Sequence, residues 1–432
     1  MQIFQELESE VRGYCRSWPT VFSSAKGSTL TDEGGRAYLD FFAGAGTLSY
    51  GHNPPAIKER LLSYLAADGV VHGLDTYTTA KRAFIERFDD VVLRPRGLRY
   101  KLQFPGPTGT NSVEAALKLA RKVTGRERVV GFTNAFHGMT LGSLAVTGSS
   151  MKRQGAGVPL NNSMPMPFDG FLGPDVDTVS YVESFLAGDG SGLDLPAAII
   201  IETVQAEGGI NVARDEWLRA LAELCLRYEI LLIVDDIQVG CGRTGPFFSF
   251  ERAGVTPDII CLSKAISGYG LPMALTLMRP ELDVWDPGEH NGTFRGNNAA
   301  FVTATAALEQ FWTDDVLTGE VDRKAAKVHD GLKGLLTEHG DLFAEVRGKG
   351  LLQGLLTQQP EMAGAVCAAA FERGLLVETS GPQSEVVKLL PPLVIDDSDL
   401  DRGLEILAES AQAVSRGPAV ELVGSTNGQV GR

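Results

Sequence analysis

Two apolar runs that end in charged residues constrain the fold of this chain most. Residues 230–234 are all apolar and are followed by Asp235, and the apolar residues 259–262 are followed by Ser263 and Lys264. Short uninterrupted apolar runs are typical of strands buried on both faces, as in a parallel sheet. Because the carboxyl ends of neighbouring parallel strands form the ligand crevice of an open α/β fold, we expect a carboxylate and an amine in one cleft.

A lysine at the end of a buried strand allows two interpretations. It can extend to the surface and keep its charge in water, or it can be desolvated, which lowers the pKa of its amine and suits it to form a Schiff base. Lys264 alone favours the first interpretation. Together with Asp235 it favours the second, because pyridoxal 5'-phosphate needs a lysine for the Schiff base and an acid that keeps its pyridinium nitrogen protonated. The pair therefore predicts a pyridoxal phosphate site with Lys264 and Asp235 as its catalytic residues.

A turn rich in glycine and threonine provides a candidate anion site. Residues 105–111 read Pro-Gly-Pro-Thr-Gly-Thr-Asn, between a strand expected over 100–104 and a helix expected over 112–124. Free amides and the positive end of the helix dipole bind anions at such a point, and an ordinary helix cap is the alternative. Beside Lys264 and Asp235 we favour a phosphate site.

The motifs around these residues resemble those of class III (ω-type) pyridoxal-phosphate aminotransferases. Residues 234–245 read Val-Asp-Asp-x-Gln-x-Gly-x-Gly-Arg-Thr-Gly, and residues 257–264 read Pro-Asp-Ile-x-x-x-Ser-Lys. The resemblance extends from about Thr29 to about Ile406. It implies the α/β architecture called fold type I, with a mostly parallel central sheet in a large domain and a smaller α+β domain built from both termini.

The resemblance also implies a set of cofactor-binding residues. Gly109 and Thr110 match the positions that bind the cofactor phosphate, although the acidic residue that usually follows is here Asn111. Phe136 matches the aromatic residue that stacks on the pyridine ring, for which any flat face suffices. Gln238 matches the residue that hydrogen-bonds the ring hydroxyl.

Thr293 matches the threonine that reaches the cofactor phosphate of the other subunit. The resemblance therefore implies a homodimer, or a higher homo-oligomer, whose sites are shared between subunits. The N-terminal residues 1–18 are expected to lie against the partner subunit.

On the substrate side, the resemblance points to Gly46, in a loop at the substrate mouth, and to a substrate-facing glutamate, Glu207. Lys388 stands where most members have an arginine that pairs with this glutamate or binds the 2-oxoglutarate carboxylate. A lysine is a point charge and cannot form the bidentate arginine fork. The carboxylate could instead be bound elsewhere, for example by Arg243.

Within the class, residues 41–46, 104–111, 288–298, 378–381 and 386–388 are most similar to the diaminobutyrate–2-oxoglutarate transaminases of ectoine biosynthesis, which share the lysine at 388. The implied reaction moves the terminal amino group of L-2,4-diaminobutyrate to 2-oxoglutarate and gives, reversibly, aspartate 4-semialdehyde and L-glutamate. The alternatives are an ω-aminotransferase for ornithine, 4-aminobutyrate or another diamine in a natural-product pathway, and a mutase or racemase on the same fold.

Composition restricts the partners. A formal charge of −15 argues against binding to nucleic acid, which needs a basic face. No apolar run is long enough to span a bilayer, so no membrane partner is expected. The five scattered cysteines lack Cys-x-x-Cys spacing, which indicates a reducing cytoplasm and no metal site.

A chain of 432 residues suits a large and a small domain. We expect residues 1–55 to be an N-terminal part of the small domain, 56–315 to be the large cofactor-binding domain and 316–416 to complete the small domain. The polar, glycine-containing residues 417–432 are expected to be a disordered tail.

Overall fold

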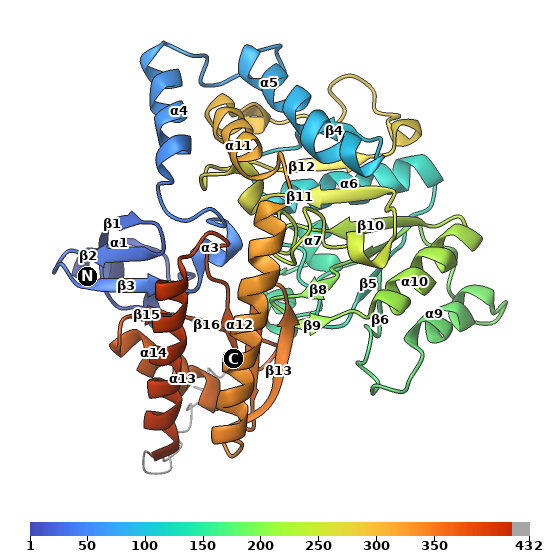
Figure 1. Cartoon of the computed structure of the whole chain (residues 1–432). Coiled ribbons are helices and arrows are strands. Elements are labelled where there is room, and N and C mark those ends of the chain that lie inside the picture. The colour runs from blue at the N-terminus through green and yellow to red at the C-terminus, as the bar shows by residue number, and fades with distance from the viewer. Residues whose placement is uncertain (417–432) are drawn as a thin grey trace.

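The computed structural model describes residues 1–416, and its largest sheet has seven strands (Figure 1). Neighbours from β11 to β6 run parallel, whereas β12 is antiparallel to both β11 and β4. The predicted α/β fold with a mostly parallel central sheet is confirmed. In spatial order the strands are β4 (Lys101–Gln103), β12 (Leu275–Met278), β11 (Ile259–Leu262), β10 (Leu231–Asp235), β7 (Ala198–Ile201), β5 (Val129–Phe132) and β6 (Ser163–Met166).

The central strands form because their residues are apolar and lie between helices. Every residue of β5, β7 and β11 is buried. Two amphipathic helices, α6 (Gly109–Thr124) and α10 (Asp215–Arg227), contribute their apolar faces to the core. The register pairs Asp235 with Cys261, so β10 and β11 end side by side. This register places the residues after both strands at one edge of the sheet.

Two smaller sheets involve the chain ends. An antiparallel sheet contains β13 (Phe343–Lys349), β14 (Leu352–Thr357), β17 (Val386–Leu389) and β16 (Glu378–Ser380) in that order. The other contains β1 (Phe22–Lys26), β2 (Thr29–Asp32), β3 (Ala37–Asp40) and β15 (Leu375–Leu376), and β15 joins β3 in parallel. N-terminal and C-terminal residues thus share one sheet. The domain boundaries at 55 and 315 remain a prediction, and the tail predicted over 417–432 lies outside the described residues.

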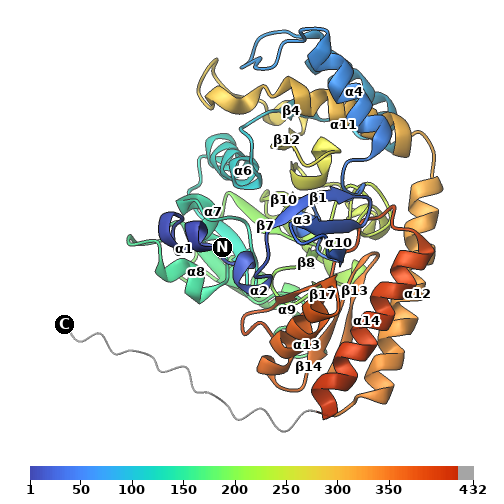
Figure 2. The same cartoon turned by 90° about the vertical axis from the view of Figure 1, so that its left-hand side faces the viewer.

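Helices cover these sheets, and the long helix α12 (Val316–Glu338) lies beside α14 (Asp397–Arg416), as Figure 2 shows. None of the helices within residues 1–416 is long and apolar enough to cross a membrane. The remaining helices are α1 (Gln2–Leu7), α2 (Tyr14–Ser17), α3 (Ala43–Gly46), α4 (Pro55–Ala66), α5 (Thr79–Phe88), α7 (Leu141–Ala145), α8 (Ser150–Gln154), α9 (Thr178–Ala187), α11 (Asn298–Phe311) and α13 (Pro360–Glu372). A short hairpin, β8 (Val204–Gln205) with β9 (Asn211–Val212), completes the elements used below.

Candidate active site

Lys264 and Asp235 lie in one cavity of about 160 Å³ at the carboxyl edge of the large sheet. Asp235 ends β10 and is buried, and Lys264 follows β11 by two residues. Lys264 has a φ of 52°, in the left-handed region that non-glycine residues rarely adopt and that is frequent at functional sites. Burial lowers the pKa of its amine, although the charge of Glu207 opposes this shift.

Asp235 is fixed by a buried histidine. His137 Nδ1 lies 2.7 Å from one carboxylate oxygen, and the Ile237 amide donates to the other at 3.2 Å. Burial by itself would lower the pKa of His137, but the hydrogen bond to Asp235 and its charge outweigh burial and raise the pKa. The histidine and the Ile237 amide therefore fix the orientation of the Asp235 carboxyl group. The sequence favours a structural role for His137, with support of a neighbouring site residue as the alternative, and the contact with Asp235 bears out that alternative.

A third carboxyl group, Glu202, lines the same cavity at the end of β7. Its Oε2 accepts a hydrogen bond from the Phe136 amide at 2.9 Å. Burial raises the pKa of Glu202 to about 8, so this side chain is mostly protonated at neutral pH. Glu202 positions the segment that carries Phe136, a role that sequence analysis did not assign.

The predicted phosphate site lies at the N-terminus of α6. Thr108 is the N-cap residue, and Asn111 Oδ1 accepts hydrogen bonds from its amide at 3.1 Å and its hydroxyl at 2.8 Å, which completes a capping box. The Thr110 hydroxyl lies 2.6 Å from that of Thr140 and 2.8 Å from that of Ser143. Hydroxyl groups and helix-terminal amides thus gather at one end of the cavity, which is a donor set suited to a phosphate.

Gly109 allows α6 to approach the segment after Asp235 closely. A Cβ at Gly109 would come within 3.0 Å of Ile237 Cδ1, so the backbone of α6 lies directly against the segment after Asp235. The residues that line the cavity fit pyridoxal phosphate, because an amine, an aspartate, the aromatic ring of Phe136 and an anion site lie together in it.

The substrate side contains a buried cluster of charges. Lys388 on β17 is fully buried, and its Nζ lies 2.7 Å from Glu207 Oε1 and 2.9 Å from Glu378 Oε1. Burial opposes the charge of Lys388, but the two carboxylates raise its pKa. Burial would likewise raise the pKa of Glu207, but the charges of Lys388 and Lys264 lower it to about 2. Glu207 and Lys388 are therefore an ion pair.

Gln238 connects this cluster to the loop of Gly46. Its Nε2 donates to Glu207 Oε1 at 3.1 Å and to the Ala45 carbonyl at 2.9 Å. The backbone at Ala45 and Gly46 has φ values of 56° and 85°, which form a tight turn against Gln238. The structure thus places Gly46 against Gln238, which in turn contacts Glu207.

Arg243 lies outside the cavity, contrary to the expectation that it could bind a substrate carboxylate. Its guanidinium is fully buried and donates to the carbonyls of Leu351 at 3.0 Å and Pro391 at 2.6 Å, and to the Ser49 hydroxyl at 3.2 Å. These partners belong to three separate segments. Arg243 therefore joins the segment after Asp235 to the smaller sheets and is not available to a substrate.

Thr293 also lies apart from the cavity of its own chain. It begins a short 3₁₀ helix, Thr293–Arg295, and is exposed. Its carbonyl is 2.7 Å from His72 Nε2, which joins it to the segment around Gly73.

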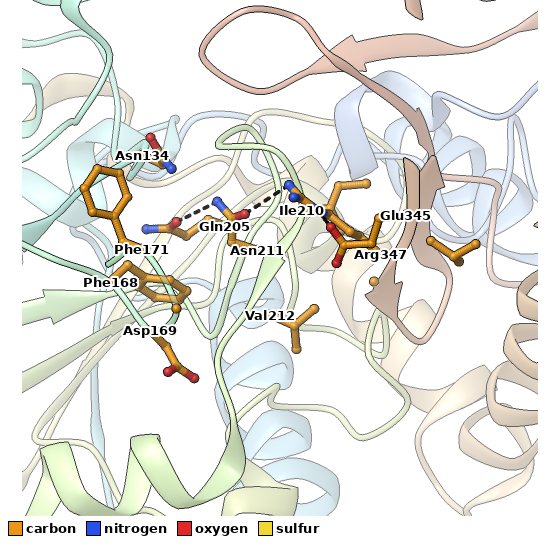
Figure 3. A pocket seen from close by; sticks show the side chains of 13 residues that line it. Asn134, Phe168, Asp169, Phe171, Gln205, Ile210, Asn211, Val212, Glu345 and Arg347 are labelled. Carbon is orange, nitrogen blue, oxygen red and sulfur yellow. Dashed lines mark hydrogen bonds and ion pairs between the residues drawn. The ribbon is translucent and has the colours of Figure 1, made fainter. Parts of the chain in front are cut away.

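A second cavity, of about 380 Å³, is lined in part by the β8–β9 hairpin, whose loop contains Glu207 (Figure 3). A chain of hydrogen bonds crosses it: Gln205 donates to the Thr133 carbonyl at 2.7 Å, Asn211 donates to Gln205 at 3.1 Å, and Arg347 donates to Asn211 at 3.4 Å. The hairpin is thereby held between the end of β5 and β13, which fixes the position of Glu207.

Comparisons with known proteins agree with this geometry. The model of the aminotransferase class-III family matches residues 14–410. The chain is 62% identical over 408 residues to the diaminobutyrate–2-oxoglutarate transaminase of Streptomyces anulatus, covering 94% of this chain and 97% of that one. It is 61% identical over 415 residues to the enzyme of the same name from Nocardia farcinica, covering 96% and 95%. A structure of the ornithine aminotransferase from Toxoplasma gondii, with partial occupancy of pyridoxal phosphate at its active site, superposes with a TM-score of 0.82 at 27% identity, covering 96% of this chain and 93% of that one.

The fold and the site thus define a pyridoxal-phosphate-dependent aminotransferase. The chain belongs to the class-III aminotransferase family, and the resemblance stated from its motifs is confirmed.

The raised pKa of Glu202 leads to an expectation for stability. The folded protein keeps this carboxyl protonated up to about pH 8, whereas the unfolded chain releases the proton near pH 4.5. Its contribution to stability is therefore full below pH 4.5 and is lost as the pH rises through about 8. Glu202→Gln should remove this loss, so the stability of the variant relative to wild type should rise over that range, by at most about 1.4 kcal/mol per pH unit.

The measurement is urea denaturation of the cofactor-free protein between pH 5 and pH 8, with exposed Glu223→Gln as the control. A difference between Glu202→Gln and wild type that does not change with pH would contradict the account.

Proposed function

We propose that this chain transfers the terminal amino group of L-2,4-diaminobutyrate to 2-oxoglutarate, giving reversibly aspartate 4-semialdehyde and L-glutamate. The observation that carries the proposal is the buried ion pair of Lys388 and Glu207. Its two charged atoms are 2.7 Å apart, and Glu207 lines the cavity that contains Lys264. The pair provides one lysine point charge for a carboxylate where most members of the family have an arginine. The names of the relatives at 62% and 61% identity support the same two substrates, diaminobutyrate and 2-oxoglutarate. The place in ectoine biosynthesis is part of the proposal and comes from the motif resemblance alone.

We propose that pyridoxal 5'-phosphate is held by Lys264, Asp235, Gly109, Thr110 and residues around the ring. Phe136 would cover one ring face and Gln238 would hydrogen-bond the ring hydroxyl. When bound, this cofactor draws electrons away from the carbon that bears the reacting amine, which makes a proton on that carbon removable. The carboxyl group of Asp235, fixed by His137, would hold the ring nitrogen of the bound cofactor in its protonated form.

The amine of Lys264 is suited to move the proton. Because burial lowers its pKa, a larger fraction of the amine is neutral than in a free lysine, and a neutral amine can accept a proton. The same ammonium can then return the proton to a different atom. Phe136 and Glu202 line the cavity around it and limit the access of water.

Lys388 is the candidate partner of the substrate carboxylate. Its charge is cancelled by Glu207 in the structure described here, so a carboxylate has to displace Glu207 or bind beside the pair. A fixed cation at a set distance from Lys264 favours one chain length. A change of one methylene is worth about 1–3 kcal/mol in such a site.

We expect kcat/KM for L-2,4-diaminobutyrate to exceed the values for ornithine and 4-aminobutyrate. For ornithine, which is one methylene longer, the expected difference is about 10-fold to 200-fold. The measurement is glutamate formation from 2-oxoglutarate with each donor, together with the single-turnover absorbance change of the bound cofactor.

Lys388→Ala should weaken the reaction of diaminobutyrate or of 2-oxoglutarate and leave cofactor binding intact. Equal efficiency with ornithine or 4-aminobutyrate would leave only a general ω-aminotransferase, and reaction without any keto acid would indicate a mutase or racemase.

We further propose a homodimer, or a higher homo-oligomer, in which Thr293 completes the phosphate site of the partner. The support is an exposed apolar surface beside Thr293, formed by two segments that are joined by the Gly73 amide and the Gly296 carbonyl at 2.8 Å. Its members are Val70, Val71, Leu74, Tyr77 and Phe294. We also propose that the protein acts in the cytoplasm on small molecules, without a nucleic acid, membrane or metal partner.

Shared sites can be tested by mixing two defective chains. Lys264→Ala and Thr293→Ala should each be impaired alone. When the two are co-expressed, a mixed dimer contains one complete site, and random pairing should restore about a quarter of wild-type activity. The matched control mixes Lys264→Ala with Asp235→Asn, whose defects lie in the same cavity of each chain, and should restore none. Absence of recovery with Thr293→Ala would contradict the shared site.

A further inference from the structure

The buried lysine of the substrate side has two acidic partners. Lys388 and Glu378 face each other across β17 and β16 as a register pair, and both are buried. Glu207 approaches the same Nζ from the β8–β9 hairpin. Two carboxylates therefore share one ammonium group, and one of them, Glu207, lines the cavity of Lys264.

Glu378 retains acceptor capacity. Its Oε1 lies 2.9 Å from Lys388 Nζ, yet it lacks a hydrogen bond of good geometry to the residues that the structure describes. Burial lowers the pKa of Lys264, and the charge of Glu378 is one of several that oppose this lowering, so Glu378 acts on the reacting end of the site. Burial raises the pKa of Glu378 itself, so a cation that enters the cluster stabilises its ionised form.

The possible amino donors differ in whether they bear an ammonium group that could contact this cluster. L-2,4-Diaminobutyrate and 4-aminobutyrate have the same carbon chain and the same reacting amine, and only the first bears an ammonium beside its carboxylate. Lys388 bears one positive charge, which can neutralise either Glu207 or the carboxylate of the donor. In both cases Glu378 has no cation of its own. A buried ammonium group needs a negatively charged partner, and Glu378 can be that partner.

We propose that Glu378 is a specificity-determining residue that selects donors bearing an ammonium next to the carboxylate. The inference rests on the proposed function and adds to it the residue that distinguishes diaminobutyrate from 4-aminobutyrate. Lys388 binds a carboxylate that both donors have, so it does not distinguish them.

The test is Glu378→Gln, which removes the charge and keeps the shape and an acceptor for Lys388. We expect kcat/KM for L-2,4-diaminobutyrate to fall about tenfold or more, the size of one lost charge-assisted hydrogen bond. The value for 4-aminobutyrate should hold or rise, and KM for 2-oxoglutarate should not increase. Glu378→Asp keeps the charge and should recover part of the preference.

The control is Glu385→Gln, which neutralises an acid just before β17 that accepts a hydrogen bond from the Gln383 amide and is not part of the cluster. Cofactor content and thermal stability are measured on each variant. An equal fall with both donors in Glu378→Gln would show that Glu378 only holds Lys388, and would overturn the inference. A wild type that does not prefer diaminobutyrate would overturn the proposed function as well, so the two failures are distinguishable.

Discussion

The parallel pairing of β10 with β11 is the constraint on which the site depends. It sets Asp235 beside Cys261, and Lys264 follows only three residues later. β7 and β5 continue the same parallel edge and add Glu202 and the segment of Phe136 and His137. Four consecutive strand ends thus provide a base, two acids and an aromatic face without long loops. The apolar strand residues that form this edge are also the centre of the core.

Burial of so many charges is possible because nearly all are paired. Asp235 has His137, Lys388 has Glu207 and Glu378, and Arg243 has the carbonyls of Leu351 and Pro391. Removing one partner of a buried pair costs about 3–5 kcal/mol, because the other charge is left uncompensated. Burial also shifts the pKa values of Glu202 and Lys264 toward their neutral forms, so these two cavity residues are sensitive to pH and to a bound ligand.

Much of this fold follows from apolar periodicity and from the residues at strand ends. Local patterns predict a strand over 259–262 and a helix over 360–372, and both have those bounds in the structure. Apolar spacing also predicts a helix over 78–93, but α5 ends at Phe88 and the chain continues through a π-helical turn before Pro95. Residues 375–378 predict one strand, whereas the structure has β15 and β16, which join different sheets. Such divisions depend on long-range pairing that a local pattern does not contain.

The site residues differ in the same way. Lys264, Asp235 and Gly109 could be placed in one cavity from local sequence, because each follows directly from a strand or helix end. Arg243 was not predictable, since its carbonyl partners lie more than 100 residues away in the chain. Glu378 meets Lys388 through the β16–β17 register and has no local motif that marks its charge as part of the site.

The central claim, that Lys264 and no other lysine holds the cofactor, has a direct measurement. The purified protein is reduced with borohydride, digested, and searched by mass spectrometry for the peptide that retains the cofactor. The account predicts the label on the peptide that contains Lys264, and none in Lys264→Ala. Lys388 is the informative alternative, because it is buried beside the same cavity but is kept charged by Glu207 and Glu378. A label on Lys388, or no fixed label in the wild type, would contradict the account.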